Sequence, residues 1–324
     1  MSESATPSAT TPLSSAQRRQ IVWLSLGAVA VFAFFRVLPT GTNLSHGDFR
    51  LEGGNVLEFC DPAAPQFLPV TTARSPVELT VSPVSAIQGQ ETSFTFQLRT
   101  STGKTIGPVD LLVAHTRKLH LMAVDSTLTD YQHVHPESVT GEPGAWRVAF
   151  TPQQSGNYRV FADFTPTATA RGLYASVDLQ VAAANVDPHV AARVGTLDQE
   201  SVVSVFPITR TKGGHRFELD AEDGVIRARE PTELTLSFQR EDGDIVQLGE
   251  VMGAFAHLVA FDRDRSGFAH LHPRETDLDQ KPDARNPELH FQVTIPAAGE
   301  YVIWAQMVLD GREIFVPFWF EVMP

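Results

Sequence analysis

The stretch LHLMAVDSTLTDYQHVHP at residues 119–136 returns as AHLVAFDRDRSGFAHLHP at residues 256–273, 137 positions later. From the first histidine of each stretch to its proline, 7 of the 17 positions are identical. Three histidines keep the same spacing in both copies, namely His120, His133 and His135 in the first and His257, His270 and His272 in the second. The chain therefore contains a duplicated unit whose histidine pattern is H-x12-H-x-H-P.

The repeat continues downstream of the histidines. FTPQQSGNYRVFADF at residues 150–164 aligns with TIPAAGEYVIWAQM at residues 294–307, so that a proline, a glycine and a tyrosine coincide. Two copies of about 100 residues have a common domain size. We predict the following order along the chain: 1–20 a cytoplasmic tail, 21–38 a transmembrane signal anchor, 39–75 a linker, 76–183 the first domain, 184–214 a connector, and 215–324 the second domain.

Both copies show the pattern of short β-strands. Apolar and polar residues alternate in VELTVSP and TSFTFQLR of the first copy and in HRFELD and ELTLSFQR of the second, with turn-forming residues between them. Such alternation is typical of antiparallel strands with one buried face. Roughly seven short strands in about 100 residues match an immunoglobulin-like or cupredoxin-like sandwich. We therefore predict an all-β protein with two tandem antiparallel β-sandwiches, preceded by one N-terminal transmembrane helix.

The N-terminus indicates export. Arg18 and Arg19 precede an uncharged apolar run, IVWLSLGAVAVFAFF, at residues 21–35. Fifteen helical residues span roughly 22 Å, less than the roughly 30 Å of a hydrocarbon core, so a signal sequence and a short signal anchor compete. No A-x-A-like cleavage site follows, which favours a retained anchor. We expect a single-pass protein of a bacterial inner membrane, with both domains in the periplasm or outside the cell.

Composition excludes one class of partner. The net charge of −13 repels nucleic acid, and no cluster of lysine and arginine opposes it. Cys60 is the only cysteine, so an intrachain disulfide is excluded. We interpret Cys60 as a small buried residue of the linker.

The histidine spacing predicts a metal site in each copy. Successive side chains of a strand alternate faces, so His133 and His135 point the same way. A hairpin that turns near Thr127 and Leu128 would place His120 opposite His135. Three imidazoles on one face can converge on one ion at about 2.0 Å each. Two other interpretations stay open: histidines that hydrogen-bond the backbone for structural reasons, and histidines that sense pH.

One position differs between the copies in a way that bears on the metal. His115 of the first copy stands where Met252 stands in the second, again 137 residues apart. If both face their sites, they would add a fourth donor to each. Imidazole binds copper and zinc, and a thioether favours copper. We expect copper, with zinc as the alternative.

The sequence favours binding over catalysis. Two histidines on one strand and one on its neighbour resemble the tris-histidine zinc site of alpha-type carbonic anhydrases. A catalytic zinc site also needs an open coordination position and a shaped pocket. The sequence contains no HExxH helix, no nucleophile elbow and no paired carboxylates beside either triad. We therefore predict a protein that is not an enzyme.

The His-x-His-Pro repeats resemble those of bacterial exported proteins with immunoglobulin-like or cupredoxin-like domains, similar to YtkA-like and copper-resistance domains. The resemblance covers residues 118–164 and 256–307. It implies copper or another divalent metal at the six triad histidines, and an envelope metal-handling or membrane protein as a partner. The contrasting hypothesis is a non-catalytic interaction module of the cell envelope with structural histidines.

Overall fold

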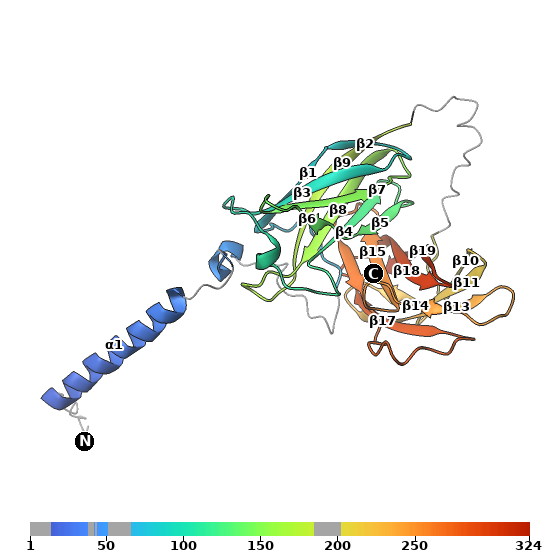
Figure 1. The fold of residues 1–324 in the computed structure, drawn as a ribbon. Helices are drawn as coiled ribbons and strands as arrows, with labels where there is room; N and C mark the ends of the chain where they lie inside the picture. Colours follow the sequence, from blue (N-terminus) through green and yellow to red (C-terminus); the bar gives the residue numbers. More distant parts are fainter. Residues whose placement is uncertain (1–13, 38–41, 43, 51–65, 185–201) are drawn as a thin grey trace, which may run out of the picture. The chain divides into compact units, whose positions relative to one another are not determined.

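The computed structural model describes residues 14–37, 42, 44–50, 66–184 and 202–324 (Figure 1). The chain divides into two compact units, Met1–Asn43 and Leu44–Pro324. Cys60 and most of the predicted cytoplasmic tail, linker and connector lie outside the described residues.

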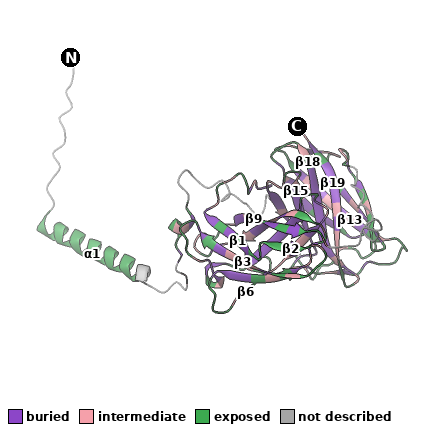
Figure 2. Cartoon of the chain, turned by 90° about the horizontal axis from the view of Figure 1, so that it is seen from above, coloured by how far each residue is buried: buried purple, intermediate pink, exposed green. Residues whose placement is uncertain are grey.

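The first unit contains the helix α1 (Ser15–Val37), whose described side chains are exposed (Figure 2). The prediction of a helix here is confirmed. Among the described residues, however, no helix is long and apolar enough to cross a membrane. The first turns of α1, up to Gln20, are largely polar, and the apolar run that follows spans only roughly 22 Å. The transmembrane part of the prediction is therefore not confirmed.

The first sandwich consists of two sheets. Two short 3-10 helices also form, η1 (His46–Phe49) and η3 (Pro108–Asp110). One sheet has the strand order β1 (Val77–Ser82), β3 (Thr92–Thr100), β7 (Ala145–Phe150), β6 (Glu137–Ser138). The other has the order β2 (Ser85–Ile87), β9 (Leu173–Ala182), β8 (Gly156–Phe164), β4 (Leu119–Asp125), β5 (Tyr131–Val134).

The second sandwich repeats this arrangement. One sheet has the order β10 (Ile208–Lys212), β11 (His215–Ala221), β13 (Pro231–Arg240), β17 (Glu288–Thr294). The other has the order β12 (Ile226–Arg227), β19 (Arg312–Met323), β18 (Gly299–Leu309), β15 (Ala256–Asp262), β16 (Phe268–Leu271), and β14 (Leu248–Gly249) pairs with β18. Since β10 pairs with β11, the second sandwich begins before residue 215, inside the predicted connector. The all-β, two-sandwich prediction is confirmed.

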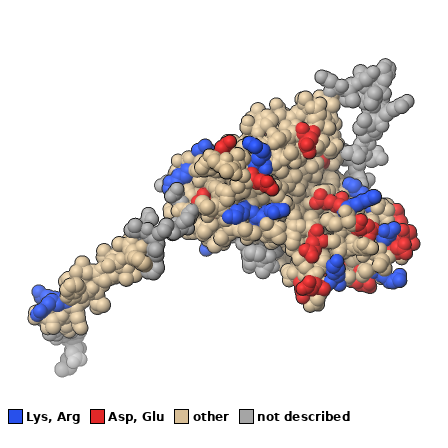
Figure 3. Space-filling model, viewed as in Figure 1, with Lys and Arg blue, Asp and Glu red and all other residues tan. Residues whose placement is uncertain are grey.

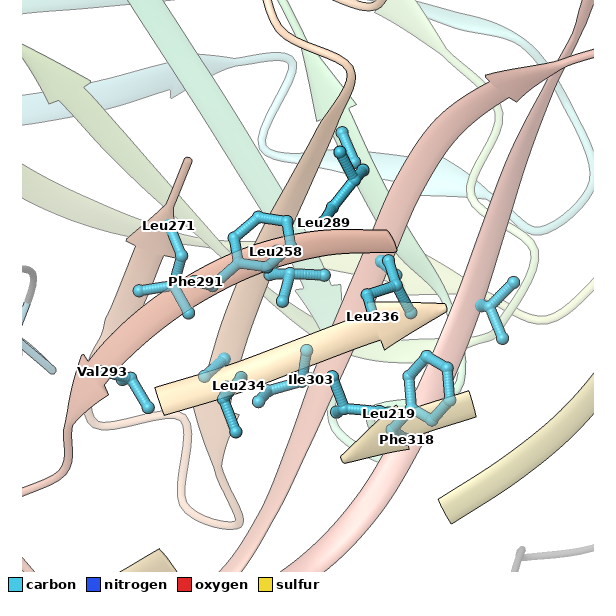
Figure 4. Packing of buried hydrophobic residues seen from close by; sticks show 14 of the residues in the cluster. Leu219, Leu234, Leu236, Leu258, Leu271, Leu289, Phe291, Val293, Ile303 and Phe318 are labelled. Carbon is cyan, nitrogen blue, oxygen red and sulfur yellow. The ribbon is translucent and has the colours of Figure 1, made fainter. Parts of the chain in front are cut away.

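Alternating strands build each core. In β3 the side chains of Phe94, Phe96 and Leu98 are fully buried, and the residues between them are not. Figure 4 shows the corresponding core of the second sandwich, where leucine, phenylalanine and valine side chains from both sheets meet.

The tyrosines that coincide in the two copies, Tyr158 and Tyr301, both hydrogen-bond the backbone four residues upstream. The Tyr301 hydroxyl donates to the carbonyl of Ala297 over 3.0 Å, and the Tyr158 hydroxyl accepts from the amide of Gln154 over 2.9 Å. This bond is a feature of immunoglobulin-like sandwiches.

The two sandwiches pack against each other through the faces that carry the histidines. All seven residues of β4 are buried, although only one face of this strand contacts its own core. Leu121 and Ala123 belong to that core, whereas Met122 and Val124 belong to a separate cluster. This interface cluster draws residues from both copies and contains Leu68, Val70, Met122, Val124, Leu128, Tyr131, Phe161, Tyr174, Val259, Phe261, Phe268, Val302, Trp304 and Trp319.

Part of the predicted linker belongs to the folded unit. The amide of Leu68 donates to the carbonyl of Phe268 over 2.8 Å, and the amide of Phe268 donates back over 3.1 Å. A Cβ atom on Gly267 would lie 1.7 Å from the carbonyl oxygen of Leu68, so only glycine allows this approach. Residues 66–73 therefore add two isolated β-bridges, at Gln66 and Leu68, and a following turn to the folded unit.

Candidate metal centre

The hairpin that carries each triad forms as the sequence predicts. Leu121 pairs with Val134, and this register places His120 opposite His135. The carboxylate of Asp125 accepts hydrogen bonds from three turn amides, those of Thr127, Thr129 and Asp130, at 2.8 to 2.9 Å.

The second hairpin uses the equivalent aspartate. Leu258 pairs with Leu271, which places His257 opposite His272. The carboxylate of Asp262 accepts from the amide of Ser266 over 2.7 Å. In both copies an aspartate at the same position accepts hydrogen bonds from amides of the turn. Because this contact needs a fixed turn, both loops keep one length while their other residues differ.

The structure brings the three histidines of each copy together. In both triads, one ring nitrogen from each histidine lies within 4.8 Å of the other two. In the first, Nδ1 of His120 lies 3.4 Å from Nε2 of His133 and 3.1 Å from Nε2 of His135. In the second, Nδ1 of His257 lies 3.1 Å from Nε2 of His270. The predicted convergence on one face is therefore present in each copy.

Backbone carbonyls fix the tautomer of the first histidine in each triad. Nε2 of His120 lies 3.0 Å from the carbonyl oxygen of Ala114, and Nε2 of His257 lies 3.1 Å from that of Val251. A carbonyl oxygen only accepts, so each Nε2 carries the proton. The other nitrogen of each ring, Nδ1, faces the triad and presents a lone pair to it.

The middle histidine of each triad is held by the other sandwich. Nδ1 of His133 lies 2.8 Å from Oε1 of Gln306, whose amide nitrogen donates to Glu313 over 2.7 Å. This second bond fixes the orientation of the glutamine amide, so Nδ1 of His133 must donate. Nδ1 of His270 lies 3.2 Å from the carboxylate of Asp163 and donates to it. Nε2 of both rings therefore presents a lone pair to its triad.

These bonds leave lone pairs facing each other. His257 Nδ1 and His270 Nε2 are 3.1 Å apart, and neither carries a proton. His120 Nδ1 and His133 Nε2 meet in the same way at 3.4 Å. Two nitrogens bound to one tetrahedral ion at 2.0–2.1 Å lie about 3.3 Å apart. In addition, Nε2 of His272 is buried without a hydrogen-bond partner. One cation in each triad would satisfy these atoms.

Burial keeps the imidazoles neutral. Desolvation lowers the pKa of His257 to about 3 and that of His135 to about 4. Desolvation, reinforced by the neighbouring histidines, also lowers the pKa of His133, His270 and His272 well below the ordinary range. Neutral imidazole is the form that binds a metal.

The same shifts predict a loss of stability in acid. Because the folded-state pKa values of His135 and His257 lie below the unfolded value of 6.5, the unfolded chain binds more protons between these limits. The free energy of unfolding of the metal-free protein should therefore fall as the pH drops from about 6.5 towards 4. Urea unfolding in a chelator, at intervals across this window, measures the slope. A His135→Asn, His257→Asn variant with an equally steep slope would contradict the assignment.

The two triads form one cluster. The ring centroids of His133 and His270, which belong to different copies, are 5.2 Å apart, and those of His133 and His257 are 5.7 Å apart. Within the first triad the centroids are 4.8 to 5.6 Å apart. The sites that the sequence predicts as one per domain therefore lie side by side at the interface.

His115 and Met252 occupy equivalent turns of the two copies. Both have a left-handed backbone, with φ of 46° and 54°. The His115 ring stacks on His272 of the second triad, with centroids 3.6 Å apart and planes at 13°. Lone pairs lie in the ring planes, and parallel planes do not meet at one ion. His115 thus lies over the second triad and is not aimed at its ion.

A cavity of about 490 Å³ opens beside the cluster. His120, His270 and His272 contribute to one wall, and His115 also lines it. No sequence pattern had pointed to this cavity, because its walls come from both copies and from the segment at residues 66–73.

Sequence reasoning also missed the acceptors Asp163 and Gln306. They stand opposite His120 and His257 on β8 and β18, and they occupy equivalent positions when FADF is aligned with WAQM. The alignment could have placed them beside the histidines. It could not show that each reaches the triad of the other sandwich.

Removing one of these acceptors should weaken one metal site. In a Gln306→Leu variant, Nδ1 of His133 loses its acceptor, so the ring is no longer held in the binding tautomer. Loss of such a partner typically costs 10–100-fold in metal affinity, and we expect about that loss at the first triad. Metal titration followed by calorimetry measures it. Gln180→Leu, at an exposed position on β9, is the matched control and should bind as the wild type does.

No curated protein matches the chain at a significant level. Solved structures that it resembles include the Lin-41 filamin domain, at 18% identity and a TM-score of 0.20, covering 32% of this chain and 91% of that one. Domains 4 and 5 of the S-layer protein SbsC match at 12% identity and a TM-score of 0.21, covering 77% and 98%.

The fibronectin(III)-like modules of Clostridium thermocellum CbhA match at 11% identity and a TM-score of 0.18, covering 76% of this chain and 93% of that one. A family model matches both copies of the repeat, at residues 72–182 and 210–324. The chain belongs to this family, which is described as a domain of unknown function, DUF8832.

Proposed function

We propose that this protein binds transition-metal ions, one at each histidine triad, and acts in metal binding or delivery. The observation that carries the proposal is the pair of unprotonated nitrogens of His257 and His270, which face each other at 3.1 Å. Hydrogen bonds to Val251 and Asp163 on the far side of each ring set the two tautomers. In the first triad, His120 and His133 face each other in the same way.

The donor set supports copper, with zinc as the alternative. Each triad offers neutral imidazole nitrogens and no thiolate, and imidazole suits both metals. Among divalent ions, Cu²⁺ binds such sites most tightly. The likeness of the His-x-His-Pro repeats to exported copper-handling domains also favours copper. Acidic side chains, which attract cations, gather over the second sandwich on the face shown in Figure 3.

The remaining parts of the proposal concern context. The basic and then apolar order of the N-terminal sequence supports a location outside the cytoplasm, in the bacterial envelope. Such a location makes an envelope metal-handling protein the natural partner. We propose binding and not catalysis, and an immunoglobulin-like fold for each sandwich. The competing function is an interaction module with structural histidines, in which the facing lone pairs would have no role.

Metal titration tests the proposal. The apoprotein should bind two equivalents of Cu²⁺ or Zn²⁺ per chain with submicromolar affinity, measured by calorimetry with competing chelators. Mg²⁺, which prefers oxygen ligands, is the control and should not bind at the triads. Absence of saturable binding by either transition metal would favour the interaction module.

A further inference from the structure

The cavity beside the histidine cluster has the composition of a ligand-binding pocket. Its volume of about 490 Å³ lies within the range of small-molecule sites. Apolar side chains line one part of it, from Leu68, Phe164, Tyr174 and Phe268. Histidines of both triads line another part, so a ligand there would contact an apolar wall and the metal centre together.

The charges in the cavity favour an anion. Lys118 lines it, and the ammonium group donates to the carbonyl of Pro108 and forms no ion pair among the described residues. Arg274 also lines it, but this guanidinium pairs with Glu233 at 2.5 Å. The carboxylate of Asp163 also lines the cavity, where it accepts a hydrogen bond from neutral His270. The lining therefore holds two cationic side chains and one carboxylate, and the ammonium group of Lys118 is the cation that forms no ion pair with another described residue.

The second triad has a free position towards the cavity. His270 and His272 both line it, whereas His257 is fully buried. His115, which is exposed, stacks over His272 at the cavity wall. An ion held by three histidines keeps a fourth position for an exogenous ligand. That position is reached from the cavity.

We propose that the cavity binds a small organic carboxylate with an apolar body. The carboxylate lies between Lys118 and the metal ion of the second triad, and the body packs on Phe268 and Tyr174. Only the contact with the ion rests on the proposed function. The contacts with Lys118 and with the apolar side chains do not depend on a bound metal.

Benzoate, with uncharged benzamide as the matched probe of the same shape, tests the proposal by calorimetry. The zinc-loaded protein should bind benzoate at least about tenfold more tightly than benzamide, since hydrogen bonds to charged groups are stronger than those between neutral groups. Lys118→Met should reduce that preference, and the contact with the ion should keep the remainder. Lys104→Met, at a lysine that pairs with Asp48, should leave it unchanged. Cobalt(II) in place of zinc should change its visible spectrum when benzoate is added.

The metal-free protein separates this proposal from the metal site. It should still prefer benzoate over benzamide, more weakly, and Lys118→Met should abolish the preference. If the protein does not bind zinc but the metal-free form still prefers benzoate over benzamide, only the metal site is overturned. In the metal-free protein, equal affinity for benzoate and benzamide, or a preference that Lys118→Met leaves intact, would overturn the carboxylate site, whatever the metal titration gives.

Discussion

Substituting His133→Ala and His135→Ala together should lower the metal stoichiometry from two ions per chain to one. The variant keeps only His120 of the first triad, and one neutral imidazole holds an ion weakly. We expect the affinity of that site to fall by a factor of about 10³ or more, since each lost ligand removes a metal–nitrogen bond. Titration with Zn²⁺ in a chelator-buffered solution measures both stoichiometry and affinity.

The mirror variant and a matched control make this experiment decisive. His270→Ala with His272→Ala should remove the other ion and leave the first. His290→Ala changes a histidine that lies outside both triads and pairs with Glu275, so its titration should equal that of the wild type. Two ions retained by both double variants would show that the triads are not the sites.

The second large effect concerns the interface between the sandwiches. Phe261 is fully buried in the interface cluster, and its ring centroid lies 5.5 Å from that of Tyr131 and 5.9 Å from that of Phe161. Phe261→Ala should lower the free energy of unfolding by about 3–5 kcal/mol, because it leaves a cavity between two folded layers. Denaturant unfolding of the metal-free protein measures this loss.

Loosening the interface should also weaken metal binding, because His133 and His270 are each held by an acceptor of the other sandwich. Val84→Ala is the control for both measurements. Val84 is 67% exposed, so its truncation should change neither stability nor affinity by a measurable amount. A Phe261→Ala protein as stable as this control would contradict the description of the interface.

The sequence predicted what depends on local spacing. The alternation in β3 and β13 follows from one buried face, and the offset between His120 and His135 follows from the hairpin register. Both are properties of neighbouring residues. The second sandwich nevertheless begins earlier than predicted, because β10 carries little alternation and is recognised by its pairing with β11.

The sequence did not predict the interface, although a signal was present. LHLMAVD is apolar at nearly every position, which indicates a strand buried on both faces, as β4 proves to be. The partner of the second face cannot be read from the run itself. For this reason three features could be recognised only from the folded structure. They are the joining of the two triads into one cluster, the acceptors that reach the triad of the other sandwich, and the cavity.

Anomalous diffraction from crystals of the copper- or zinc-loaded protein, recorded at the absorption edge of the metal, tests the central claim most directly. We predict two peaks per chain, each about 2.0–2.1 Å from the facing nitrogens of one triad. One peak lies among His120, His133 and His135, and the other among His257, His270 and His272. Peaks elsewhere in the chain, with both triads closed by hydrogen bonds alone, would contradict the account.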